Sequence, residues 1–100
     1  MLKSLNSHHN EVFLSLLRDR REAIGLPQSE LAQKLGQTQA TVSRVETGER
    51  RLDVIELRAW LRALEVDFIG FMKILDSRLR DTPLHDLHLG RRPSIGRSQR

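Results

Sequence analysis

The sequence predicts an all-α protein, and three observations lead to this prediction. Apolar residues recur at spacings of three and four along most of the first 80 positions, which is the period of amphipathic helices. Residues that cap or end helices stand between these segments. No segment alternates apolar and polar residues over a convincing length, as a half-buried strand would. We expect one compact domain of five helices, since 100 residues leave little room for a second core.

The first two helices are expected over residues 11–24 and 28–35. Gly25 supplies the left-handed residue that commonly ends a helix. Pro27 lies where the second helix begins, and its fixed φ is compatible with that position. The residues expected to face the core are Phe13, Leu17 and Ile24 on the first helix and Leu31, Ala32 and Leu35 on the second.

A third helix is expected over residues 39–47. Gly36 ends the helix before it, and Thr38 is a suitable N-cap because its hydroxyl can accept a bond from a free backbone N–H. The apolar face consists only of Val42 and Val45, three residues apart. Most of the other side chains are uncharged hydrogen-bonding groups. Thr and Ser are poorer helix formers than Glu or Lys, so helix propensity does not explain them.

Two further helices follow, each introduced by an aspartate. Asp53 is expected to cap the fourth helix, and Glu56 three residues later resembles the second half of a capping box. Asp67 is expected to cap the fifth helix, which runs to about Arg80. The buried stripe predicted for the fourth helix is Val54, Leu57, Trp60, Leu61 and Leu64, and that of the fifth is Phe68, Met72, Leu75 and Leu79.

The fifth helix carries more apolar residues than one buried face requires. Ile69, Phe71 and Ile74 fall outside its main stripe. Either the long first helix or a second copy of the chain covers them, and we favour a homodimer. The predicted dimer interface is Ile69, Phe71, Met72, Ile74 and Leu75.

The chain is expected to divide into a flexible N-terminus at residues 1–10, a helical domain at 11–80 and a basic disordered tail at 81–100. Pro, Gly, Ser and Arg dominate the end of the chain. Residues 1–75 hold 11 Lys/Arg against 10 Asp/Glu, whereas residues 76–100 hold 6 against 3. The net charge of +4 therefore arises mainly from the tail, and bulk charge alone cannot indicate a nucleic-acid partner.

The composition argues against several classes of protein. There is no cysteine for a disulfide or a thiolate metal site, and the four histidines lack the acidic cluster that would complete a metal site. We find neither a glycine-rich phosphate loop nor a Ser/His/acid set, so we expect no cofactor and no enzyme. The first residues do not resemble a signal peptide, and no run of 18 apolar residues exists. We expect a cytoplasmic protein that does not enter a membrane.

The segment GQTQATVSRVETGER, residues 36–50, carries the strongest functional pattern. Two short helices joined by a tight Gly-containing turn, the second with a polar face, describe a helix-turn-helix, whose second helix enters the DNA major groove. Gln can pair bidentately with adenine and Arg with guanine, while Ala and Thr methyl groups touch the thymine methyl. The segment supplies each of these side chains, so the sequence predicts binding to double-stranded DNA.

The stretch QSELAQKLGQTQATVSRVETGER closely resembles the Xre/lambda-repressor-like (Cro-type) family of helix-turn-helix DNA-binding regulators. The family pattern is Gln-x-x-Leu-Ala, a Gly turn and a Ser-Arg-x-Glu-x-Gly ending, and the resemblance covers residues 13–75. It implies a five-helix domain and a dimeric repressor that reads a palindromic operator through residues 39–47. The matching residues are Gln28, Leu31, Ala32, Gly36, Ser43, Arg44, Glu46 and Gly48.

The resemblance also implies a role for individual positions. Arg21 and Glu46 would form a structural ion pair between the first and third helices, and Gln28 would brace Gln39. The base-reading residues would be Gln39, Ala40, Thr41, Ser43 and Arg44. The phosphate-binding residues would be Gln28, Gln37, Thr38, Thr47, Arg50 and Arg51.

Two positions depart from the family pattern. Pro27 stands where Ser, Thr or Asn often caps the second helix, and this removes a side-chain cap worth ~1 kcal/mol. Glu65 stands where the family usually has glycine after Leu64, which implies either a different turn or some strain.

Three alternatives to a free-standing repressor remain. An antitoxin of a toxin–antitoxin module would use the same helix-turn-helix to autoregulate its operon and would hold a toxin protein with the fifth helix or the tail. A restriction–modification controller is similarly compatible. An adaptor that lost DNA binding is also conceivable, but the presence of Gln28, Gln39 and Arg44 argues against it.

Overall fold

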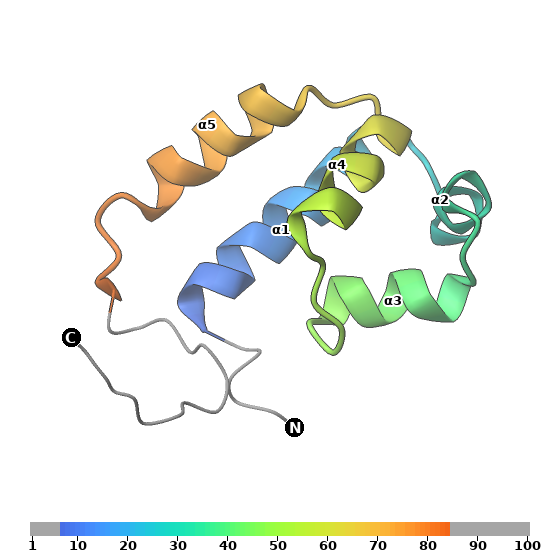
Figure 1. Ribbon diagram of the computed structural model, residues 1–100, viewed down its shortest axis with the longest axis horizontal. Helices are drawn as coiled ribbons and strands as arrows, with labels where there is room; N and C mark the ends of the chain where they lie inside the picture. The colour runs from blue at the N-terminus through green and yellow to red at the C-terminus, as the bar shows by residue number, and fades with distance from the viewer. Residues whose placement is uncertain (1–6, 85–100) are drawn as a thin grey trace.

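The computed structural model describes residues 7–84, which form five helices (Figure 1). No strand occurs within these residues, so the predicted all-α class is confirmed. Residues 1–6 and most of the tail predicted at 81–100 lie outside the described residues. The helices are α1 (His8–Ala23), α2 (Gln28–Leu35), α3 (Gln39–Thr47), α4 (Val54–Ala63) and α5 (Phe68–Leu79).

Helix α1 begins three residues earlier than the sequence indicated. Its N-cap is Ser7, whose Oγ accepts a hydrogen bond from the backbone N–H of Asn10 at 3.1 Å. Residues 8–10 are His, His and Asn, so apolar periodicity could not reveal this first turn. The imidazole Nε2 of His9 lies 3.1 Å from the carbonyl oxygen of Pro83, which joins the start of α1 to the segment after α5.

The C-terminal end of α1 also differs in detail from the prediction. The helix ends at Ala23, and Gly25 follows with a left-handed φ of 68°. Ile24 was predicted to face the core, but it is 48% exposed because the chain leaves the helix at this point. Leu26 is buried in its place.

Helices α2 and α3 pack against each other and form the helix-turn-helix unit. Pro27 makes no side-chain cap, as its chemistry dictates, but its carbonyl oxygen accepts a bond from the N–H of Leu31 at 3.0 Å. Helix α2 ends at Gly36 in the left-handed conformation, and Thr38 caps α3 two residues later. This short connection turns the chain sharply, so α3 lies along one edge of the molecule (Figure 1).

The core lies between α1, α2, α4 and α5, with the two valines of α3 inserted into it. Val54 was predicted to join the core but is 61% exposed; it is the first residue of α4, and burial on this helix begins only at Leu57. The buried apolar residues are Leu16, Leu17, Leu26, Leu31, Ala32, Val42, Val45, Leu57, Trp60, Leu61, Leu64 and Phe71.

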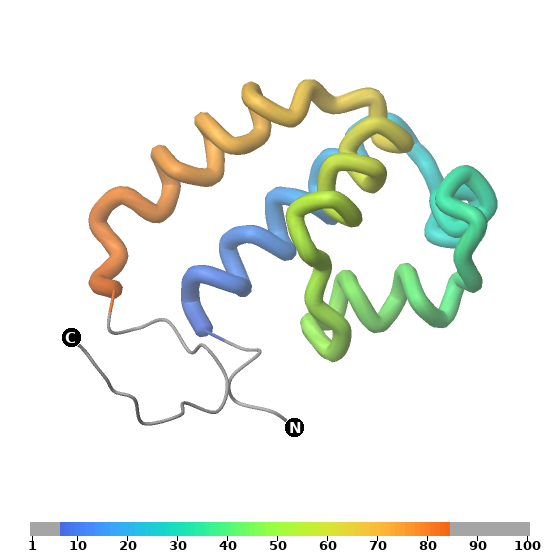
Figure 2. The backbone as a smooth tube through the Cα atoms, viewed as in Figure 1, coloured from blue at the N-terminus to red at the C-terminus, as the bar shows by residue number. Residues whose placement is uncertain are grey.

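Helix α5 lies beside α1, as the backbone trace shows (Figure 2). Phe71 is only 1% exposed and packs edge-on against Phe13, with ring centroids 6.1 Å apart. Its assignment to a dimer interface was therefore wrong, because α1 of the same chain already covers it. Ile69 and Ile74 remain 59% and 41% exposed, whereas Met72 and Leu75 are half-buried.

The turn between α4 and α5 places Glu65 at φ 62°. Among residues 7–84 it is the single non-glycine residue with a positive φ, and Gly25, Gly36 and Gly48 adopt the same left-handed region. The chain therefore keeps a turn that favours glycine while carrying a glutamate there, and the backbone is strained at this position.

Candidate nucleic-acid interface

Helix α3 presents its polar side chains to solvent. Val42 and Val45 are fully buried and attach the helix to the core, which turns the opposite face outward. Thr41 and Ser43 lie at the margins of that face and are half-buried. The exposed residues of the face and of the preceding turn are Gln37, Thr38, Gln39, Ala40, Arg44 and Thr47.

A buried ion pair joins α1 to α3. The guanidinium of Arg21 donates to both carboxylate oxygens of Glu46, from Nε to Oε2 at 2.6 Å and from Nη2 to Oε1 at 3.1 Å. Nη1 of Arg21 also donates to the carbonyl oxygen of Leu26 at 2.8 Å. The side chains of Arg21 and Glu46 are 11% and 4% exposed, so each charge depends on the other for compensation. The hydrogen bond to Glu46 raises the pKa of Arg21 above its ordinary value.

Two glutamines extend this ion pair to the surface. Gln28 Nε2 donates to Glu46 Oε1 at 2.9 Å, and Gln39 Nε2 donates to Gln28 Oε1 across a longer 3.5 Å. The resemblance implied the second contact, whereas the bond from Gln28 to Glu46 was not predicted. The first residue of α3 is thus linked through Gln28 to a fixed charge in the protein interior.

Threonine hydroxyls hold both ends of α3. Thr38 Oγ1 accepts a bond from the backbone N–H of Thr41 at 3.1 Å, and the hydroxyls of the two threonines lie 3.1 Å apart. At the other end Thr47 Oγ1 donates to the carbonyl oxygen of Arg44 at 3.2 Å, and Gly48 ends the helix with φ 89°. Helix α3 therefore has both ends fixed by hydrogen bonds.

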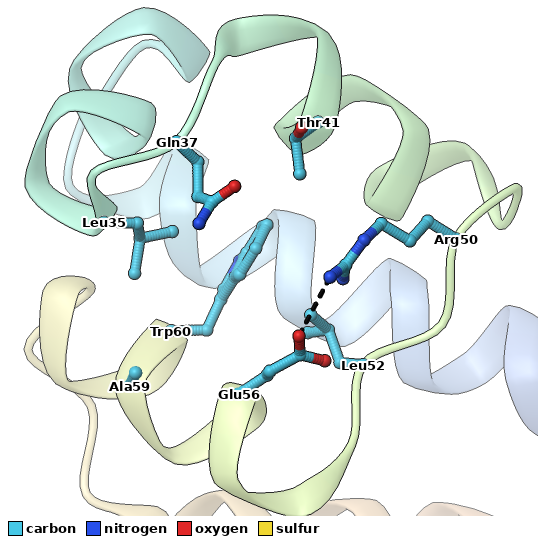
Figure 3. A pocket seen from close by; sticks show the side chains of 8 residues that line it. All are labelled: Leu35, Gln37, Thr41, Arg50, Leu52, Glu56, Ala59 and Trp60. Carbon is cyan, nitrogen blue, oxygen red and sulfur yellow. Dashed lines mark hydrogen bonds and ion pairs between the residues drawn. The ribbon is translucent and has the colours of Figure 1, made fainter.

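The two arginines after α3 are both exposed. The guanidinium of Arg50 forms an ion pair with Glu56 of α4, with Nη2 and Oε2 2.8 Å apart (Figure 3). Its Nη1 also donates to the carbonyl oxygen of Arg51 at 3.3 Å. The sequence predicted Glu56 as a helix-capping residue, and that role is present, but it did not reveal the ion pair because this depends on the path of the α3–α4 loop.

A pocket of about 100 Å³ lies behind α3, between the end of α2, the α2–α3 turn, α3, the α3–α4 loop and α4 (Figure 3). Trp60 lies in the middle of the lining residues, and its Nε1–H is buried without an acceptor among residues 7–84. The pocket was not predicted, because its walls come from five separate segments. The lining residues are Leu35, Gln37, Thr41, Arg50, Leu52, Glu56, Ala59 and Trp60.

Within residues 7–84, no group of three or more His, Cys, Asp or Glu side chains is placed to hold a metal ion. None of the helices described is long and apolar enough to cross a membrane.

Taken together, a sharply turned helix pair and a firmly held, outward-facing polar helix define a helix-turn-helix DNA-binding protein. The helix-turn-helix family HTH_3 matches residues 17–71, and the chain belongs to this Xre/lambda-repressor-like family. It is accordingly a helix-turn-helix DNA-binding regulator of the XRE type, a class of regulators rather than enzymes.

Solved structures of related proteins share the fold. An XRE-family like protein from Pseudomonas syringae pv. tomato str. DC3000 is 39% identical, with a TM-score of 0.68 over 75% of this chain and 88% of that chain. The wild-type restriction–modification controller protein C.Esp1396I is 23% identical, with a TM-score of 0.67 over 75% of this chain and 97% of that chain. Its tetramer in complex with its natural 35 base-pair operator matches at 22% identity with a TM-score of 0.67, over 76% of this chain and 100% of that chain. No curated protein matches the chain.

Proposed function

We propose that the chain is a sequence-specific transcriptional repressor that binds a palindromic operator as a homodimer through α3. The observation that carries this proposal is the exposed polar face of α3, held in place by Val42, Val45 and the buried Arg21–Glu46 pair. The exposed amide, hydroxyl and guanidinium groups of this face match the hydrogen-bonding edges of bases in the major groove. A repressor of this kind acts by occluding a promoter, which implies a cytoplasmic location.

The residues of α3 have complementary roles in this proposal. Gln39 is suited to adenine and is oriented by Gln28, while Arg44 is suited to guanine. The methyl groups of Ala40 and Thr41 are suited to thymine, and Ser43 lies at the groove edge.

Phosphate contacts surround the base-reading residues. The N-termini of α2 and α3 point backbone N–H groups and positive dipole ends outward, which favours phosphate oxygens there. Side chains near these ends and after α3 add hydrogen bonds and charge. The proposed phosphate-binding residues are Gln28, Gln37, Thr38, Thr47, Arg50 and Arg51.

Dimerisation is proposed through the outer face of α5. Ile69 and Ile74 are exposed, whereas Met72 and Leu75 are half-buried and pack against the core, so that only part of each is left for a second copy. Two copies joined there would read half-sites about one helical turn apart, roughly 10 base pairs centre to centre. The controller protein C.Esp1396I, which shares the fold, binds its operator as a tetramer, and this supports assembly on DNA.

Selection from a random DNA pool, followed by binding measurements on variants, tests the proposal. Gln39→Ala and Arg44→Ala should each cost ~1–3 kcal/mol on the selected site and relax the preference at one base position. Arg51→Ala should weaken all sequences about equally and reduce the salt slope by about one. Arg78→Ala is the matched control, because it removes an exposed arginine from α5.

Two results would contradict this proposal. If selection from the pool enriches no sequence, the chain does not recognise DNA in a sequence-specific way. If Arg44→Ala weakened the selected site and random DNA alike, the base-reading role of that residue would be wrong.

The antitoxin alternative predicts a separate result. A toxin protein should then co-purify with the chain, and its gene should lie beside this one. Nothing in residues 7–84 favours this alternative over the free-standing repressor.

A further inference from the structure

The guanidinium of Arg50 already forms an ion pair with a carboxylate of the same chain. This guanidinium lies 2.8 Å from Glu56 Oε2, and both side chains are about two-fifths exposed, at 41% and 39%. The pair lies at the pocket behind α3, next to the surface proposed to meet the DNA backbone (Figure 3). A phosphate that approaches Arg50 therefore meets a guanidinium with an anionic partner in place.

The carboxylate of Glu56 is held more firmly than the guanidinium. Oε1 accepts a bond from the backbone N–H of Asp53 at 2.9 Å, and the backbone N–H of Glu56 donates to Asp53 Oδ1 at 2.7 Å. This capping box uses one carboxylate oxygen and leaves the other for Arg50. The hydrogen bonds from Arg50 and Asp53 hold the pKa of Glu56 below its ordinary value, so it stays ionised near neutral pH.

We propose that Glu56 competes with the DNA backbone for Arg50 and thereby lowers the affinity and the salt dependence of DNA binding. Exposed ion pairs are worth only ~0–1 kcal/mol, so a phosphate can replace Glu56 as the partner of Arg50. The capping box anchors Glu56, so it remains close to Arg50 throughout. This inference rests on the proposed DNA binding, and it assigns to Glu56 the role of lowering the affinity for DNA.

The substitution Glu56→Gln separates the two roles of this side chain. Glutamine can retain the capping box through its amide oxygen, but it lacks the charge that holds Arg50. Asp53→Asn is the matched control: asparagine is also a good N-cap, and the substitution removes one negative charge close by without touching the Arg50 pair. Thermal unfolding of both variants checks that α4 is intact.

Binding is measured with random-sequence duplex DNA at several salt concentrations. Glu56→Gln should raise the affinity about two- to fivefold, which is the fold-change that corresponds to a surface ion pair. It should also steepen the slope of log K against log salt by at most about 0.9, because Arg50 then neutralises a phosphate without an anionic competitor. Asp53→Asn should leave the slope unchanged. When Arg50→Ala is combined with Glu56→Gln, the gain in affinity and the steeper salt slope should both disappear.

Trp60 supplies a second readout that does not involve DNA. It is the only tryptophan of the chain and lines the same pocket as Arg50 and Glu56. Glu56→Gln and Arg50→Ala should each change its fluorescence emission in the free protein, because each breaks the pair. Asp53→Asn should not.

The outcomes separate the inference from the proposed function. If the wild-type chain binds duplex DNA and Glu56→Gln leaves both affinity and slope unchanged, the competition is absent and DNA binding stands. A gain that survives Arg50→Ala, or that Asp53→Asn reproduces in full, would show a general charge effect and overturn the inference. If the folded wild-type chain binds no duplex at low salt, the proposed function itself is wrong.

Discussion

Glu65 has a backbone conformation that three glycines of the same chain also adopt. Its φ of 62° brings Cβ close to a carbonyl oxygen, which costs an L-residue ~1–2 kcal/mol. The backbone N–H of Glu65 bonds to the carbonyl oxygen of Arg62 at 3.0 Å, and that of Val66 to Leu61 at 2.8 Å. These bonds belong to the end of α4 and maintain the turn in spite of the strain.

The substitution Glu65→Gly should therefore stabilise the fold. We expect an increase of ~0.5–1 kcal/mol in the free energy of unfolding, since the strain relieved exceeds the extra backbone entropy that glycine loses. Urea denaturation measures this change. Arg58→Gly, in the middle of α4, is the control and should destabilise by ~1 kcal/mol. A loss of stability in Glu65→Gly would show that the glutamate makes a compensating contribution.

The buried pair between α1 and α3 illustrates how one element orients another. Glu46 accepts bonds from Arg21 and Gln28, and its own helix carries the side chains that we propose read the bases. Arg21→Ala should destabilise the chain by ~3–5 kcal/mol, because the Glu46 carboxylate would be left buried and unpaired. Arg18→Ala removes an exposed arginine from the same helix and should change the free energy of unfolding by less than ~0.5 kcal/mol. Equal effects of the two substitutions, in denaturant unfolding, would contradict the structural importance of the pair.

The helices could be predicted because their signals are local. Thr38, Asp53 and Asp67 cap the helices that follow them, and Gly36 and Gly48 end helices at the expected positions. The start of α1 was missed because its cap precedes three polar residues. The ion pair of Arg21 and Glu46 was implied by the family resemblance alone, as 25 residues separate its members.

Other features depend on how the elements meet. Helix α5 packs most of its predicted stripe, Phe68, Met72 and Leu75, against the core, but periodicity did not show that Phe71 belongs to the same buried face. The contact of Arg50 with Glu56 and the pocket beside Trp60 arise where a loop returns across α4. The base and phosphate contacts stay predictions, since they require the partner molecule.

At the scale of the whole molecule, α5 separates the core from the proposed dimer surface. Phe71 faces inward, whereas Ile69 faces solvent. Ile69→Glu should therefore shift the chain toward monomer while leaving the thermal stability of the monomer almost unchanged, because a surface substitution costs little within one chain. Phe71→Ala should instead lower the stability by ~3–5 kcal/mol. Sedimentation across a concentration series measures the shift of Ile69→Glu toward monomer. The proposed dimer would be contradicted if the wild-type chain stayed monomeric at high micromolar concentration, both with and without operator DNA.

The hydrogen bonds that join Arg21, Glu46, Gln28 and Gln39 indicate which positions of α3 can be changed without loss of the fold. The contacts that orient α3 use positions 21, 28, 39 and 46, together with the buried valines. Ala40 and Arg44 make no side-chain contribution to that set, so a library randomised at these two positions should keep its fold in most members. Gln39 belongs both to this set and to the proposed base-reading residues, whereas Ala40 and Arg44 belong only to the latter, so new specificities should be selectable at positions 40 and 44 on an unchanged scaffold.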